Sequence, residues 1–96
     1  MQHMRIIGEI QHPTLKISIF KMGERVSVKF ENALYEQTFK LGTEERFQDP
    51  EAIKALVDAQ FLAAVTQIFG QMHQLKMAAQ QRAFPATGEN LFESIL

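Results

Sequence analysis

Apolar and polar residues alternate along the first half of the chain, and this pattern predicts β-strands. In residues 15–22, for example, Leu15, Ile17 and Ile19 alternate with Lys16, Ser18 and Phe20. Successive side chains of a strand point to opposite faces, so the alternation gives one apolar face and one solvated face. The predicted strands cover residues 4–10, 15–22, 25–31 and 34–41. Because the connections between them are short, we expect an antiparallel meander.

The turn at residues 23–24 fixes how the second and third strands pair. Its first residue is glycine, which suits the first central position of a two-residue hairpin turn. This turn sets Lys16 opposite Glu31 and Ser18 opposite Lys29, so the charges that face each other are compatible.

A second two-residue turn, at residues 32–33, is predicted to pair the third and fourth strands. It would set Lys29 opposite Glu36 and Ser27 opposite Thr38. Gln37 then faces the apolar side of the sheet, where its amide needs either a buried hydrogen bond or an opening to water. The other residues expected on that inner side are Tyr35, Phe39 and Leu41.

Apolar residues after position 49 recur at spacings of three and four, which is typical of an amphipathic helix. These residues are Ile53, Val57, Phe61, Ala64, Val65, Ile68, Met72 and Leu75. Asp49 can cap the helix and Pro50 suits its first position. We predict one helix over residues 50–82 and an α+β fold, a four-stranded antiparallel meander followed by one long amphipathic helix packed on the apolar face of the sheet. Residues 1–83 would form a single domain, and residues 84–96 a C-terminal tail or a short docking segment.

This helix is too long for its sheet. It would extend about 50 Å at 1.5 Å per residue, whereas strands of seven residues span only about 23 Å. Either the helix breaks near Gly70, where glycine costs about 1 kcal/mol relative to alanine, or its second half projects and packs on another chain.

The apolar arc of the helix is also wide, about 160° where one sheet needs roughly 100°. The residues expected to contact another chain are Leu62, Phe69, Met72 and Met77. In the alternative, the C-terminal segment, with Phe84 and residues 91–96, folds back and covers this surface in a monomer.

Composition narrows the classes of function. The 96 residues include ten basic and eleven acidic side chains, so the net charge of −1 creates no global field for nucleic acid or an anionic membrane. The lack of cysteine excludes disulfides and thiolate chemistry. No apolar run approaches the roughly 20 residues of a membrane span, and the N-terminus has no signal-peptide core, so we expect a cytoplasmic protein without membrane contact.

The residue pattern offers little for catalysis. His3, His12 and His73 are far apart in sequence and form no metal-binding motif. The five glycines are isolated, so no phosphate-binding loop is expected. We therefore expect no catalytic residue, no cofactor and no metal site, and a protein that is not an enzyme.

The leading hypothesis is a small interaction or assembly module that acts as a homodimer or as an accessory subunit. Its partner would be a second copy or another protein. The alternative is a nucleic-acid-binding accessory protein that uses basic residues and one aromatic platform on the outer sheet face. The residues of that alternative are Lys16, Phe20, Arg25, Lys29 and Lys40, and they are interleaved with Glu31 and Glu36.

Overall fold

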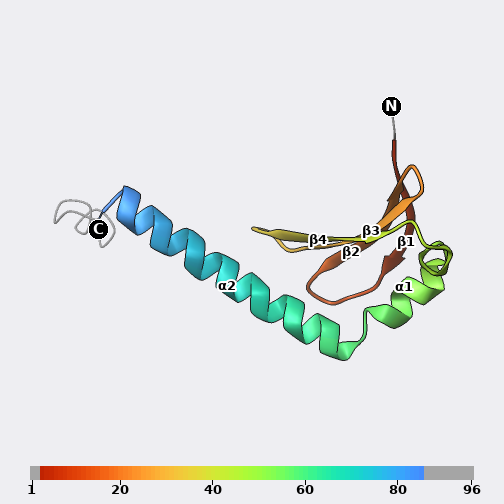
Figure 1. Cartoon of the computed structure of the whole chain (residues 1–96). Helices are drawn as coiled ribbons and strands as arrows, with labels where there is room; N and C mark the ends of the chain where they lie inside the picture. The colour runs from red at the N-terminus through yellow and green to blue at the C-terminus, as the bar shows by residue number, and fades with distance from the viewer. Residues whose placement is uncertain (1–2, 86–96) are drawn as a thin grey trace.

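The protein has an α+β fold in which a four-stranded antiparallel sheet is followed by a short and a long helix (Figure 1). The computed structural model describes residues 3–85, so the tail predicted after residue 85 lies outside the described residues. The elements are β1 (Met4–Ile10), β2 (Lys16–Met22), β3 (Arg25–Glu31), β4 (Glu36–Gly42), a 3₁₀ turn η1 (Glu45–Phe47), α1 (Pro50–Leu56) and α2 (Ala59–Ala83). The strands are adjacent in chain order, β1-β2-β3-β4. The predicted fold class is confirmed.

The β2–β3 hairpin has the predicted register. Lys16 pairs with Glu31 and Ser18 with Lys29, around a turn that joins Met22 to Arg25. Gly23 has a φ of 63°, a conformation that costs glycine little because it has no Cβ. This turn therefore fixes which side chains of β2 and β3 share a face.

The predicted β3–β4 register is wrong by two residues. Lys29 pairs with Thr38 rather than with Glu36, because the connection is longer than a two-residue turn. The Asn32 side chain accepts hydrogen bonds from the backbone N–H groups of Leu34 (2.9 Å) and Tyr35 (2.8 Å), which holds residues 32–35 in the loop and delays β4 until Glu36. A shift of two residues keeps every side chain on its predicted face.

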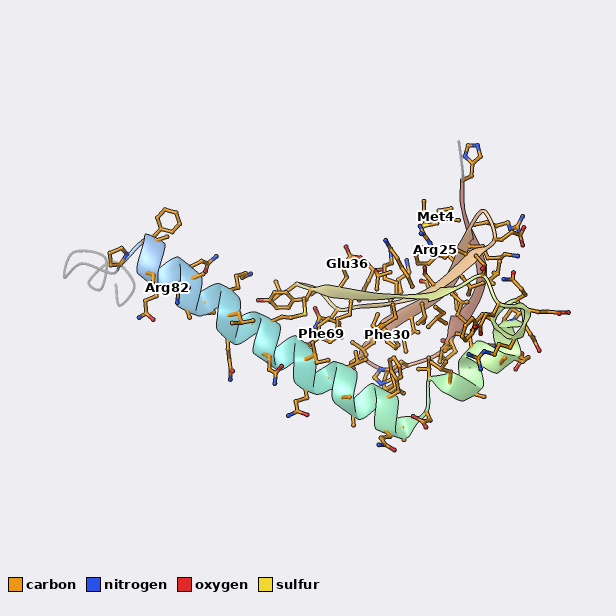
Figure 2. The ribbon with its side chains drawn as sticks, in the orientation of Figure 1. Met4, Arg25, Phe30, Glu36, Phe69 and Arg82 are labelled. Carbon is orange, nitrogen blue, oxygen red and sulfur yellow. The ribbon has the colours of Figure 1, made fainter. Side chains whose placement is uncertain are left out.

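The core lies between the inner sheet face and the two helices. Phe61 of α2 stacks on Phe30 with ring centroids 5.5 Å apart and meets Phe39 edge-on at 5.2 Å. Figure 2 shows Phe30 and Phe69 in this layer between sheet and helix. The buried cluster consists of Ile17, Ile19, Val26, Val28, Phe30, Ile53, Val57, Val65 and Phe69. Each such side chain contributes about 1.5–3 kcal/mol when fully buried.

Gln37 lies on the inner side of the sheet, as predicted. Its Nε2 donates a hydrogen bond of 2.9 Å to the backbone carbonyl of Val65 in α2. The buried hydrogen bond expected from the sequence is therefore present, and it ties β4 to the long helix.

The single helix predicted over residues 50–82 is two helices. The chain bends by 70° between α1 and α2, at Val57 and Asp58. The Asp58 side chain accepts a hydrogen bond from the backbone N–H of Phe61 (2.8 Å), so this residue caps a new helix. Gly70, where a break was considered, lies inside α2.

The short helix α1 packs at the β1 end of the sheet. Asp49 caps it and Pro50 takes its first position, both as predicted. A Cβ at Gly8 of β1 would lie only 3.3 Å from the Cβ of Pro50, so this glycine permits the close approach of α1. Within residues 3–85, neither helix alone is long and apolar enough to cross a membrane, and α1 and α2 reach that length and composition only together, across the bend.

Candidate interaction surface

The second half of α2 extends past the sheet (Figure 1). The last residue of α2 that packs against the core is the half-buried Met72, and residues 73–85 are all exposed. The helix of 25 residues is about 38 Å long at 1.5 Å per residue. It is longer than any strand of the sheet. We call residues 73–83 the projecting half of α2.

The projecting half is held to the sheet at its start only, by Tyr35 of the β3–β4 loop. The Tyr35 hydroxyl lies 2.8 Å from His73 Nδ1, and Lys76 Nζ lies 5.1 Å from the centre of the Tyr35 ring. Arg82, near the C-terminal end of α2, lies far from the sheet in Figure 2. The radius of gyration is 18.2 Å, against about 12.5 Å for a compact domain of this length.

Large apolar side chains lie exposed on α2 and at its C-cap. Leu75 is 71% exposed and Phe84 is 78% exposed, and Ile68 and Met77 are exposed as well. Gln71, Gln74, Leu75 and Ala78 line an open groove of about 420 Å³. A second open groove, of about 450 Å³, is lined by Met77, Gln80, Gln81 and Phe84. Exposed apolar surface of this kind is typical of a contact with another molecule.

The four residues predicted to contact another chain occupy different environments. Phe69 is 6% exposed and belongs to the core, Leu62 and Met72 are half-buried against the core, and Met77 is exposed. The wide apolar arc was correctly inferred, but the pattern did not reveal which edge of it faces the sheet. Sequence reasoning missed Ile68 and Leu75 as exposed residues, because both continue the apolar periodicity that predicted burial.

The charges of α2 are separated along its length. Asp58 caps the N-terminal end, whereas residues 59–83 contain Lys76, Arg82 and His73 but no acidic residue. Carboxylates near a helix N-terminus and basic side chains near its C-terminus both interact favourably with the helix dipole. The helix is therefore acidic at one end and basic at the other.

The residues proposed for nucleic-acid binding share one face of the sheet, but their aromatic platform is missing. Phe20 is 6% exposed, so the prediction that its ring is available for base stacking is wrong. Its cross-strand neighbours are Ile6 of β1 and Ser27 of β3. Of the basic residues, Lys16 and Lys40 are exposed and Arg25 is half-buried.

The charges on that face are also partly neutralised. Lys29 Nζ lies 3.3 Å from a Glu31 carboxylate oxygen and 3.9 Å from one of Glu36. Glu36 lies on the side of the sheet away from α2 in Figure 2. The pairing of acidic with basic residues leaves little local field for phosphate groups.

Two of the three histidines have structural contacts, and His3 is exposed. His12 Nδ1 accepts hydrogen bonds from the backbone N–H groups of Thr14 (3.2 Å) and Leu15 (3.1 Å), which shapes the β1–β2 connection. His73 pairs with Tyr35 at the edge of an open cleft of about 580 Å³ that is also lined by Leu34, Phe69 and Gly70. Among the described residues, no group of three or more potential ligands could hold a metal ion.

Comparisons with known proteins identify no relative of this chain. No protein-family model matches the chain, and neither the curated proteins nor the solved structures contain a significant match.

Proposed function

We propose that this protein is a non-enzymatic assembly module that acts through the projecting half of α2, as a homodimer or as an accessory subunit of a larger complex. One observation carries the proposal. The helix continues for about three turns beyond its last core contact and exposes Leu75, Met77 and Phe84 there. A helix gains little from such length in isolation, because most helical stability in proteins comes from packing of an apolar face.

The exposed apolar side chains are the energetic reason for a partner. Burying a leucine, methionine or phenylalanine side chain contributes about 1.5–3 kcal/mol. A partner that covered Leu75 would recover this free energy without any change in the sheet. The proposal assumes the cytoplasmic location expected from the sequence.

The test is the molar mass of the purified protein at micromolar concentration, by light scattering and analytical ultracentrifugation. We expect a dimer, and we expect Leu75→Glu to weaken association without lowering the stability of the fold. Thr66→Glu is the matched control, because Thr66 is exposed on the side of α2 opposite Leu75. Phe69→Glu is unsuitable, since Phe69 is buried and its replacement would unfold the protein.

A monomeric protein over the whole concentration range would refute the homodimer. The accessory-subunit form would then be tested by co-purification from the native source with the wild-type protein and with Leu75→Glu. A partner lost in Leu75→Glu and kept in Thr66→Glu supports it, and absence of any Leu75-dependent partner refutes it.

A further inference from the structure

One exposed side of α2 carries residues at alternating spacings of four and three. They are Ala64, Ile68, Gln71, Leu75, Ala78 and Arg82, and every one is exposed. We call this set the exposed stripe. Alternating spacings of four and three are those with which two helices pack side by side along their length. The exposed stripe therefore has the geometry of a seam for another helix.

The groove around Leu75 is lined by residues at the spacing that such packing uses. Its lining residues, Gln71, Gln74, Leu75 and Ala78, stand at positions i, i+3, i+4 and i+7 of the helix. Four residues at these positions form the hole that receives one side chain of a facing helix. Ile68, two turns before the centre of this groove, is an exposed β-branched side chain of suitable size.

The charges select the direction of the second helix. In a parallel pair, Arg82 of one copy would face Arg82 of the other, and the two helix dipoles would be aligned. In an antiparallel pair, the basic end of each α2 lies beside the end of the other that carries Asp58, and the dipoles oppose each other. Charge complementarity thus favours a second copy of this chain in the antiparallel orientation.

We propose that two copies of α2 pair antiparallel about a two-fold axis at Gln71, with Ile68 of each copy in the Leu75 groove of the other. This proposal rests on the proposed function and names its partner. With the axis at Gln71, Ile68 lies in the partner's groove and Arg82 is level with the partner's Gln60, about 3 Å along the axis from the partner's Asp58 at 1.5 Å per residue. This register places the basic end of each copy beside the partner's Asp58, so the packing and the charges favour the same direction.

Disulfide trapping tests the register directly, because the chain contains no cysteine. Gln71→Cys lies on the proposed axis and should form a covalent dimer on mild oxidation. Ala78→Cys alone should not, whereas mixing Ala78→Cys with Ala64→Cys should give a mixed disulfide dimer. Thr66→Cys is the matched control, an exposed residue on the opposite side of α2 that should stay unlinked. Circular dichroism checks that each variant folds.

The outcomes separate the two proposals. A non-covalent dimer in which Ala78→Cys links to itself, or in which Gln71→Cys does not link, refutes the antiparallel register and leaves the proposed function standing. A monomer at all concentrations refutes the register together with the homodimer. Arg82→Glu supplies an independent readout, since it should raise the dissociation constant of the dimer about tenfold through two exposed charge pairs, and an unchanged constant refutes the charge argument.

Discussion

Gln37 is a polar residue on the apolar side of the sheet, and its contacts explain how the core tolerates it. Its Nε2 donates to the Val65 carbonyl, which as a helix carbonyl also accepts an intrahelical bond, while its Oε1 is buried without a partner. An unpaired buried acceptor costs about 1–3 kcal/mol. The net contribution of the Gln37 side chain to the free energy of unfolding is therefore small, because this cost offsets the hydrogen bond.

Two substitutions at Gln37 test this balance. We expect Gln37→Leu to change the free energy of unfolding by less than about 1 kcal/mol, since it removes the donor and the unpaired acceptor together. Gln37→Glu should lower it by about 1–3 kcal/mol, because a carboxylate would face the Val65 carbonyl in a partly buried site. Urea denaturation measures both, and a larger loss in the leucine variant than in the glutamate variant would contradict this account.

At the scale of elements, the break at Asp58 decides what α2 can reach. Asp58→Ala removes the acceptor for the Phe61 N–H and should cost about 0.5–2 kcal/mol, the usual value for an N-cap. Asp58→Asn keeps an acceptor and should cost much less. Thermal unfolding followed by circular dichroism compares the two, and equal losses would mean that the charge of Asp58, rather than its hydrogen bond, stabilises the start of α2.

The sequence predicted these elements well where one local signal determined the structure. Alternation located the four strands, and Gly23 fixed the β2–β3 register. The β3–β4 register could not be predicted from turn length, because Asn32 makes a loop with its side chain that competes with a two-residue turn. The helix break was missed because Ile53, Val57, Phe61 and Val65 continue one spacing of four across a 70° bend. Periodicity is insensitive to such a bend, although Asp58 followed by a helical run was an N-cap signal.

The exposed apolar surface of α2 was predictable in kind but not in its residues. The excess length and the wide apolar arc of the helix both indicated surface beyond what one sheet covers. Which edge of the arc stays open depends on how the helix sits on the sheet, with Val65 and Phe69 buried and Ile68 and Leu75 exposed. That rotation is set by contacts with the Phe30 and Phe39 rings across the core, which no local pattern reports.

At the scale of the whole molecule, the structure separates into a folded layer pair and a helix that extends from it. The hypothesis of assembly requires part of the helical surface to stay uncovered in one molecule. It would be wrong if both helices were fully buried within that molecule. The chain does break into two helices, but only α1 and the first half of α2 pack on the sheet, since residues 73–85 are all exposed. The break therefore shortens the buried helix without removing the exposed one.

A shortened chain that ends at Lys76 tests this division. The remaining protein keeps the whole buried cluster and the contacts of Tyr35 with His73 and Lys76. Its free energy of unfolding, measured at a protein concentration low enough to dissociate the wild-type dimer, should therefore fall by no more than about 1 kcal/mol, the range of a surface change. The melting temperature of the wild-type protein should rise with protein concentration, because association stabilises the folded state by mass action, and that of the shortened chain should not. Loss of cooperative unfolding in the shortened chain would instead mean that residues 77–85 stabilise the fold itself, and the argument that they serve a partner would lose its basis.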